Sequence, residues 1–417
     1  MRRTLVAVIA AAVITPLALS ACGDKKSSAN SSWVHSTPSA DASAGASAGA
    51  TGDPVLESAA VPIDLAVTPA QGKTGVPTST EISFKVSGAK VTTVTLKDAA
   101  GKPVAGELRA DGAAWVPAKQ LKNKQTYEAS VTATTDGGQT KTTTSKFTTM
   151  AAPARKTGTG LYLFDGKTYG VAMPVVVEFH PGIKKADRAT VEKRMFVSTS
   201  PAQPGVWAWT PNGSQAYYRS KEFWKPGTTL AVRIAVGGLP TGGGRYGDRD
   251  RSATAKIGRD FEMRVDNASK KMTVLKDGKA VKTMPVSLGR KSNPSVSGTM
   301  VVMDKLAETV FDTTDTDGDE GYRTEIQYAQ RLTWSGQYIH SAPWSVGDQG
   351  RRNVSHGCVN VSPSNARWLF TNTLIGDPVT VKGTEDKLGY GDGWTPWNVS
   401  WEQFTKGSAL PVPQSLK

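Results

Sequence analysis

The chain has 417 residues, a formal net charge of +14, and 38% hydrophobic residues. This length exceeds one ordinary domain and suggests about three, and the composition is that of a globular protein with a buried core. The charge favours anionic surroundings, but the basic residues are dispersed without interleaved aromatic residues. We therefore expect no nucleic-acid partner.

The N-terminus predicts export. Met1-Arg2-Arg3 and the apolar run 4–19 form the charged and apolar regions of a signal peptide at 1–21, rather than a spanning helix. The run ends in Leu19-Ser20-Ala21-Cys22, which resembles the lipobox of bacterial lipoproteins, where the cysteine receives a lipid. The alternative is an ordinary signal whose cleavage site contains a cysteine. Residues 22–60 are rich in Ala, Ser and Gly and predict a flexible tether.

Two β-rich modules are expected next, at 61–150 and 151–255. The first alternates apolar and polar residues in predicted strands at 81–86, 91–96 and 127–132, with turns at 98–101, 111–112 and 136–138. An internal repeat supports the second, because aromatic and apolar positions recur at a constant offset of 103 residues. The pairs are Trp115 and Tyr218, Leu121 and Trp224, Tyr127 and Leu230, and Val131 and Ile234.

A third module is expected at 256–383, opening with strands at 261–265, 271–275 and 280–287. The acidic segment 312–321 lacks the EF-hand spacing for calcium, so we expect a lid over the site. An extension at 384–417 carries Trp394, Trp397, Trp401 and Phe404 and is too short to fold alone. We expect it to pack back on the modules, and the alternative is an exposed aromatic binding patch.

The hexapeptide 355–360, Ser-His-Gly-Cys-Val-Asn, carries the chemistry. With Cys22 lipidated, Cys358 is the free cysteine, and two of the four histidines lie nearby, at His356 and His340. A thiol needs a base or a positive field to attack at neutral pH. The alternatives are an inert buried cysteine and part of a zinc site, although no fourth zinc ligand has a suitable spacing. We expect no metal and no cofactor.

These residues resemble the L,D-transpeptidase (YkuD-type) family of bacterial cell-wall enzymes. His340 with the hexapeptide matches the family signature, and 321–324, 334–345 and 391–394 resemble its multidomain members. The resemblance implies a mainly β chain, with two tandem Ig-like β-sandwich modules, a catalytic β-sandwich domain and the Trp-rich extension. It also implies that the loop at 293–298 lies away from the thiol.

The resemblance implies a role for each site residue. Cys358 is the nucleophile, His340 the base, and Ser341 orients the base through its carbonyl group. His356 holds the loop or tunes the thiol, and the N–H groups of Gly357 and Cys358 face the oxyanion. Tyr322 is a further oxyanion candidate. The residues expected to border or bind the donor peptide are Tyr322, Ser335, Gly336, Trp344 and Asn360.

The implied reaction has two steps on peptidoglycan stem peptides. The thiol attacks the bond before the terminal D-alanine of a tetrapeptide donor, and an amine of an acceptor stem resolves the thioester to a 3→3 crosslink. The family also implies acylation of the thiol by carbapenems. Rival functions are an L,D-carboxypeptidase or cysteine peptidase on wall peptides, and a non-catalytic lipid-anchored wall-binding protein. We expect a monomer on the outer face of the cell membrane, reaching into the wall.

Overall fold

The computed structural model describes residues 62–312, 314 and 323–417. The predicted signal peptide, Cys22, the tether, Tyr322 and most of the acidic segment lie outside the described residues. Strands dominate the described part, so the predicted mainly β fold class is confirmed. None of its helices has the length and apolar character needed to span a bilayer.

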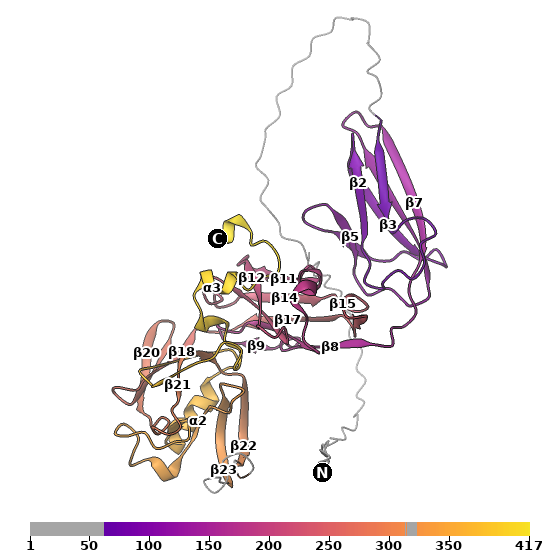
Figure 1. Cartoon of the computed structure of the whole chain (residues 1–417). Coiled ribbons are helices and arrows are strands. Elements are labelled where there is room, and N and C mark those ends of the chain that lie inside the picture. The colour runs from indigo at the N-terminus through magenta and orange to yellow at the C-terminus, as the bar shows by residue number, and fades with distance from the viewer. Residues whose placement is uncertain (1–61, 313, 315–322) are drawn as a thin grey trace, which may run out of the picture. The chain divides into compact units, whose positions relative to one another are not determined.

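The first pair of sheets lies within 64–148 (Figure 1). One sheet has the order β1-β2-β5-β4 and the other β3-β6-β7, and the three predicted strands are found as β2, β3 and β6. Gly101, Gly112 and Gly138 have positive φ at the predicted turns. The strands are β1 (Asp64–Thr68), β2 (Ile82–Ser87), β3 (Lys90–Asp98), β4 (Gly106–Leu108), β5 (Ala114–Pro117), β6 (Thr126–Thr134) and β7 (Thr140–Thr148).

The second pair of sheets has the orders β12-β13-β10-β8-β16-β15 and β11-β14-β17-β9. A short helical stretch, η1 (Lys185–Asp187) and α1 (Arg188–Glu192), precedes β11. The strands are β8 (Lys156–Leu161), β9 (Thr168–Tyr169), β10 (Val175–His180), β11 (Met195–Ser200), β12 (Gly205–Trp209), β13 (Gln215–Ser220), β14 (Thr229–Ile234), β15 (Pro240–Gly242), β16 (Arg245–Gly247) and β17 (Arg251–Ile257).

The internal repeat has a structural counterpart in the strand orders. Trp115 lies on β5, between β2 and β4, and Tyr218 lies on β13, between β10 and β12. Val131 lies on β6, between β3 and β7, and Ile234 lies on β14, between β11 and β17. Residues 103 positions apart therefore occupy equivalent strands of the two pairs of sheets.

The third pair of sheets has the orders β20-β19-β18-β26-β21-β27 and β22-β23-β24-β25, and α2 (Pro363–Asn372) packs against β23 and β24. The three strands predicted to open this module are found as β18, β19 and β20. The strands are β18 (Phe261–Asp266), β19 (Lys271–Lys276), β20 (Lys279–Pro285), β21 (Val296–Val301), β22 (Asp304–Asp312), β23 (Arg323–Arg331), β24 (Tyr338–Ser341), β25 (Val359–Val361), β26 (Pro378–Lys382) and β27 (Asp386–Lys387).

Arg219 of β13 binds the C-terminal extension to the second pair of sheets. Its guanidinium group is buried 4.5 Å from the ring centroids of Trp397 and Phe404 and 5.2 Å from that of Trp401. Burial lowers the pKa of Arg219 to about 10, so the group stays protonated at neutral pH. The aromatic residues of the extension are thus packing groups, and the alternative of an exposed aromatic patch is wrong. The elements of the extension are η4 (Pro396–Asn398), α3 (Trp401–Thr405) and η5 (Gln414–Leu416).

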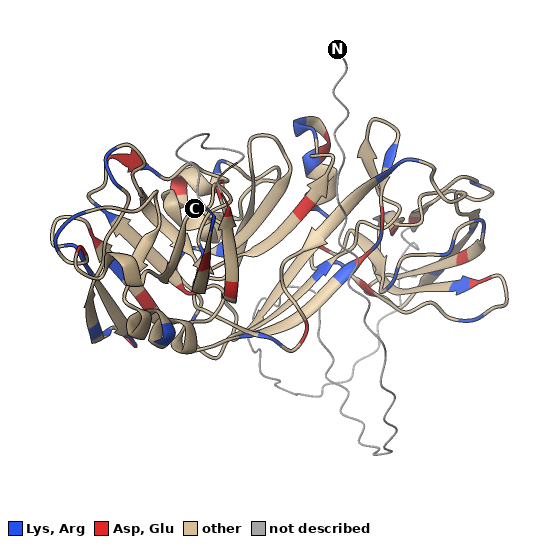
Figure 2. Cartoon of the chain, turned by 90° about the horizontal axis from the view of Figure 1, so that it is seen from below, with Lys and Arg blue, Asp and Glu red and all other residues tan. Residues whose placement is uncertain are grey.

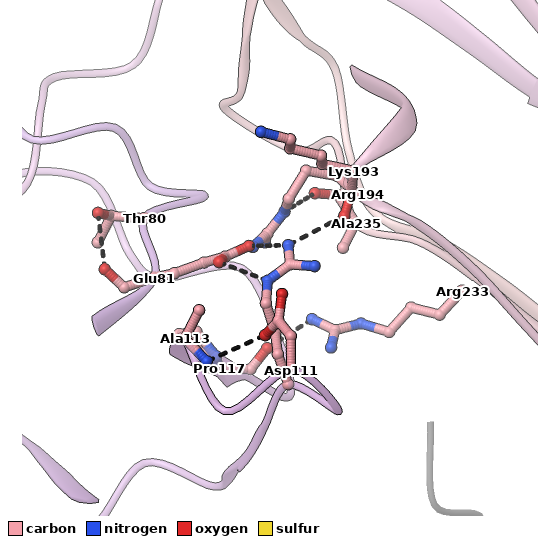
Figure 3. A network of polar contacts seen from close by, with 10 residues as sticks. Thr80, Glu81, Asp111, Ala113, Pro117, Lys193, Arg194, Arg233 and Ala235 are labelled. Atoms are coloured by element: carbon pink, nitrogen blue, oxygen red, sulfur yellow. Dashed lines mark hydrogen bonds and ion pairs between the residues drawn. The ribbon is translucent and has the colours of Figure 1, made fainter. Parts of the chain in front are cut away.

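An ion-pair network connects the first pair of sheets to the second (Figure 3). The Glu81 carboxylate accepts hydrogen bonds from Arg109 and from the buried Arg194, and Arg194 Nε donates to the carbonyl group of Ala235 at 3.1 Å. Burial alone would raise the pKa of Glu81, but the two guanidinium groups outweigh it and the pKa is lowered. The carboxylate is therefore ionised at neutral pH and neutralises a buried cation.

Charged side chains are mixed in sign over the molecule. Figure 2 shows Lys and Arg positions interspersed with Asp and Glu positions along the ribbon. Several of these charges form exposed ion pairs, such as Lys146 with Glu128 at 3.1 Å and Lys406 with Glu402 at 2.7 Å. Such exposed pairs contribute little to stability. The Glu81 network differs from them because one of its cations, Arg194, is buried.

Replacing Glu81 by Gln leaves Arg194 buried without a counter-charge. We expect Glu81→Gln to destabilise the chain by about 3 kcal/mol, the lower end of the cost of breaking a buried pair, since Glu81 is partly exposed. The measurement is calorimetric unfolding at pH 7, with Glu128→Gln as the matched control for an exposed pair.

The same substitution has a pH signature. Because the pKa of Glu81 is lowered in the folded chain, its stabilisation is present above the ordinary value of 4.5 and is lost as the pH falls through the folded value. The difference between the wild type and Glu81→Gln should therefore shrink on acidification. A difference within about 0.5 kcal/mol at pH 7, like that of an exposed pair, would contradict the structural role.

Candidate active site

The parallel pairing of β24 with β25 brings the candidate residues together. Ile339 lies opposite Val359, and His340 lies opposite Asn360. Because successive side chains of a strand point to opposite faces, Ile339 and Val359 enter the core while His340 and Asn360 share the other face. Cys358 directly precedes β25, and its Sγ lies 3.8 Å from the carbonyl oxygen of Gly336, two residues before β24.

The hexapeptide is held on both sides by backbone contacts. Asn360 exchanges two backbone hydrogen bonds with Ser287, at 2.9 and 3.1 Å. Helix α2 begins directly after β25, with Ser362 as its N-cap and a proline in its first turn, and it buries Ala366 and Leu369. The nucleophile candidate therefore directly precedes a short strand whose position is fixed by both neighbours.

The loop at 293–298 contacts the hexapeptide, which corrects the expectation that it lies away from the thiol. Ser295 Oγ is buried and donates a 2.6 Å hydrogen bond to the carbonyl group of Gly357. The same oxygen accepts a 2.9 Å hydrogen bond from Gly289 N–H. The loop thus supports the residue next to the cysteine.

His340 is buried and has one defined orientation. Its Nδ1 lies 2.8 Å from the carbonyl oxygen of Ser341. A carbonyl oxygen only accepts, so Nδ1 carries the proton and Nε2 of the neutral ring has a free lone pair. Burial lowers the pKa of His340 to about 4, and the Ser341 carbonyl only partly offsets this. The ring is thus neutral at pH 7 and can accept a proton.

Aromatic rings surround His340. The ring of Phe311, from β22, contacts it edge-on with a centroid distance of 5.4 Å, and the ring of Trp344 lies at 6.0 Å. Phe311 also lies 4.6 Å from the ring of Tyr338, which precedes His340 by two residues on β24. These apolar faces replace water around the imidazole and account for its lowered pKa.

The Cys358 thiol is also withdrawn from water. The residue is 8% exposed, and Sγ lies 3.8 Å from the carbonyl oxygen of Gly336. Burial raises the pKa of the thiol to about 12, and the backbone of Tyr338 offsets only part of this rise. The resting site therefore holds a protonated thiol and a neutral imidazole, rather than a thiolate–imidazolium pair.

The candidate oxyanion donors differ in their availability. Gly357 has φ +118 and its N–H donates a 3.2 Å hydrogen bond to Ser355 Oγ, which itself donates to the carbonyl group of Cys358 at 2.7 Å. The Gly357 N–H is therefore engaged in holding the turn. Tyr322, the side-chain candidate, lies outside the described residues.

The remaining predicted residues fall into two groups. Asn360 and Ser341 are buried beside His340, and Asn360 Nδ2 donates to Ser345 Oγ at 3.1 Å. Ser335, Gly336 and Trp344 are exposed, and Trp344 is 58% exposed, so its ring is not part of the core.

His356 does not join the buried pair. Its side chain is exposed, while Cys358 and His340 are buried. Gly357, with positive φ, interrupts the extended backbone between His356 and Cys358. The alternation that would place residues two apart on one face therefore does not apply here.

Several contributors were not predicted. Phe311, Ser295 and Ser345 act through contacts between residues far apart in sequence, and no local pattern marks them. Asp392 belongs to the Gly-Asp-Gly-Trp run that carried part of the resemblance, and it accepts hydrogen bonds from Ser335 N and Oγ at 2.8 and 2.6 Å. No group of three or more His, Cys, Asp or Glu side chains able to hold a metal occurs in the part of the chain that the structure describes.

Comparisons with known proteins place two segments of the chain in known families. Residues 260–381 match the L,D-transpeptidase catalytic domain, and residues 73–240 match the bacterial Ig domain. A solved structure of an L,D-transpeptidase in complex with imipenem is 32% identical, with a TM-score of 0.46, and the match covers 55% of this chain and 100% of that one.

Two curated relatives come from Mycobacterium tuberculosis. L,D-transpeptidase 5 is 34% identical over 358 residues, which cover 84% of this chain and 78% of the relative. L,D-transpeptidase 2 is 35% identical over 346 residues, which cover 81% of this chain and 83% of the relative. The predicted order of an Ig-like region before the catalytic domain is confirmed. The chain therefore belongs to the L,D-transpeptidase family, a family of peptidoglycan-crosslinking enzymes.

Proposed function

We propose that this chain forms 3→3 crosslinks in peptidoglycan through a thioester on Cys358. The observation that supports this most is the orientation of His340, whose Nδ1–H is held by the Ser341 carbonyl and which lies opposite Asn360, two residues after Cys358. This leaves Nε2 as the proton acceptor. The donor is a tetrapeptide stem, and the acceptor is the side-chain amine of a neighbouring stem.

In the first step, Cys358 Sγ bonds to the carbonyl carbon before the terminal D-alanine while Nε2 of His340 takes the thiol proton. The C–N bond then breaks, the imidazolium returns the proton to the leaving amine, and D-alanine departs. Such proton transfer contributes about 10²–10⁴-fold to the rate. Because both groups are neutral at rest, charge develops only during attack.

The developing oxyanion needs donors that do not have to reorganise. The Cys358 N–H and the Tyr322 hydroxyl are the proposed donors, while the Gly357 N–H is engaged with Ser355 Oγ. In the second step the acceptor amine attacks the thioester, His340 takes its proton, and the sulfur leaves and is reprotonated. Water in place of the amine gives the L,D-carboxypeptidase reaction.

The remaining parts of the chain serve reach and placement in this proposal. Cys22 carries the lipid, residues 22–60 tether the enzyme outside the membrane, and the two modules at 61–150 and 151–255 carry the catalytic domain at 256–383 into the wall. Ser335, Gly336, Trp344 and Asn360 border the donor peptide. Trp344 supports this role because its ring is exposed beside His340. The enzyme acts as a monomer.

The decisive test is product analysis with a disaccharide-tetrapeptide. Mass spectrometry of the reaction should show a crosslinked dimer lacking one D-alanine. A lone tripeptide product would instead support the hydrolytic rival, and no turnover would support the non-catalytic one. Cys358→Ala should give neither product while keeping the thermal midpoint close to that of the wild type.

The acidity of His340 predicts the pH dependence of acylation. A protonated ring cannot accept the thiol proton, so the rate of acylation by a carbapenem should fall as the pH drops through about 4. Above that it should stay level up to pH 9, because the thiol pKa is about 12. Intact mass at timed intervals measures the rate. A rise centred between pH 6 and 7 would show that the imidazole keeps its ordinary pKa.

The protonated resting thiol predicts slow alkylation by a reagent that depends on thiolate. Iodoacetamide should modify Cys358 roughly 100-fold more slowly than glutathione at pH 8, since the scarcity of thiolate outweighs its greater nucleophilicity. Peptide mass spectrometry resolves Cys358 from Cys22, and Cys358→Ala gives the background. Alkylation faster than that of glutathione would mean that the thiolate exists before substrate binds.

A further inference from the structure

We propose that Asp392 is a positioning residue that fixes the turn 334–336 against the thiol of Cys358. The inference rests on the role of Cys358 as the nucleophile in the proposed function. Asp392 lies outside the segment 260–381 that matches the catalytic domain, so the C-terminal extension completes the site.

The turn 334–336 is exposed, and two side chains hold different parts of it. Arg331 donates a 3.0 Å hydrogen bond to the Trp334 carbonyl group and lies 5.3 Å from the Trp334 ring centroid, whereas Asp392 binds Ser335. Trp334, Ser335 and Gly336 are exposed, and Gly336 has φ +97 with open space where a Cβ would lie. Asp392 Oδ1 accepts the Ser335 N–H at 2.8 Å and Oδ2 accepts the Ser335 hydroxyl at 2.6 Å. Hydrogen bonds to a carboxylate are roughly twice as strong as neutral ones. One side chain therefore holds both the backbone and the side chain of the middle residue.

The turn 334–336 also contacts the reacting sulfur. The carbonyl oxygen of Gly336 lies 3.8 Å from Cys358 Sγ. Thr333 Oγ1 lies 2.9 Å from Ser335 Oγ and accepts the Gln337 N–H at 3.0 Å, and Leu332 N–H donates to the Gln337 carbonyl at 2.9 Å. A rotation of Ser335 would therefore turn the Gly336 carbonyl and with it the acceptor that orients the thiol.

Asp392 is itself rigidly placed. The carbonyl group of Gly393 accepts a 2.9 Å hydrogen bond from the buried Tyr217 hydroxyl of β13, and Gly391 N–H donates to Thr395 Oγ1 at 2.8 Å. Gly393 has φ +98, and a Cβ there would meet the Leu332 carbonyl at 2.8 Å. The backbone beside Asp392 is thus held between the second pair of sheets and the strand end that leads into the turn.

The geometry therefore connects the second module to the nucleophile through the extension. Tyr217 holds Gly393, Asp392 holds Ser335, and Gly336 faces Cys358. Misplacement of reacting groups by about 1 Å can cost on the order of 100-fold in rate. Loss of the Asp392 contacts should act on the maximal rate of acylation more than on the affinity for the acylating ligand.

The test is carbapenem acylation of the full chain, followed by intact mass over a range of ligand concentrations. Asp392→Ala should lower the maximal rate constant about 10- to 100-fold, with a smaller change in the half-saturating concentration. Asp392→Asn should stay within about threefold of the wild type, because its amide oxygen can accept the Ser335 N–H and its amide nitrogen can donate to Ser335 Oγ. Glu402→Ala, which removes an exposed carboxylate from the same extension, is the matched control and should leave the rate unchanged.

Thermal midpoints of all variants separate positioning from stability. If Asp392→Ala unfolds, the similarly shaped Asp392→Leu takes its place in the comparison. Wild-type rates in Asp392→Ala or Asp392→Leu, or equal losses in the Asn and Ala variants, would overturn the inference. Cys358→Ala is run alongside. Acylation of Cys358→Ala would overturn the proposed function. If Cys358→Ala is not acylated but Asp392→Ala is acylated at the wild-type rate, only the positioning role of Asp392 is ruled out.

Discussion

The parallel pairing of β24 with β25 is the constraint on which the proposed chemistry depends. It places His340 opposite Asn360, two residues after Cys358, while Ile339 and Val359 fill the core beneath. A shift of one residue in this register would send the imidazole into the core and an isoleucine into the site. The flanking contacts of Ser287 and the start of α2 after Ser362 fix that register. The fold therefore serves the site chiefly by holding two short strands in place.

Burial from water then determines the protonation states of His340 and Cys358. Burial lowers the pKa of His340 and raises that of Cys358, so both groups are uncharged at rest. A buried ion pair would need donors and charges that compensate for the lost hydration, and the aromatic faces around His340 supply none. The site thus differs from cysteine enzymes that keep a thiolate ready. In the proposed mechanism the base acts at the moment of attack, which makes the orientation of the ring by the Ser341 carbonyl more important than the charge of the ring.

Local patterns in the sequence predicted much of this architecture, because strand alternation and turn glycines are short-range signals. The strands at 81–86, 91–96, 127–132 and 261–265 and the positive φ of Gly101 follow from period-two alternation and turn chemistry. Solvent exposure of the site residues was less predictable. Trp344 is exposed, and His356 is exposed while Cys358 is buried, because Gly357 interrupts the extended backbone between them. Ser295 and Asp392 could not be assigned, since they meet their partners across 62 and 57 residues. The burial that lowers the pKa of His340 likewise involves Phe311, which comes from another strand.

The withdrawal of the Cys358 sulfur has a consequence for the lifetime of the enzyme outside the cytoplasm. Oxidation to sulfenic acid and beyond begins from the thiolate and requires access to the sulfur. With the pKa of the thiol near 12 and only 8% of the residue exposed, almost none of that form is present. The arrangement that delays ionisation until substrate arrives therefore also protects an unpaired cysteine from peroxide, and it does so without a reducing partner.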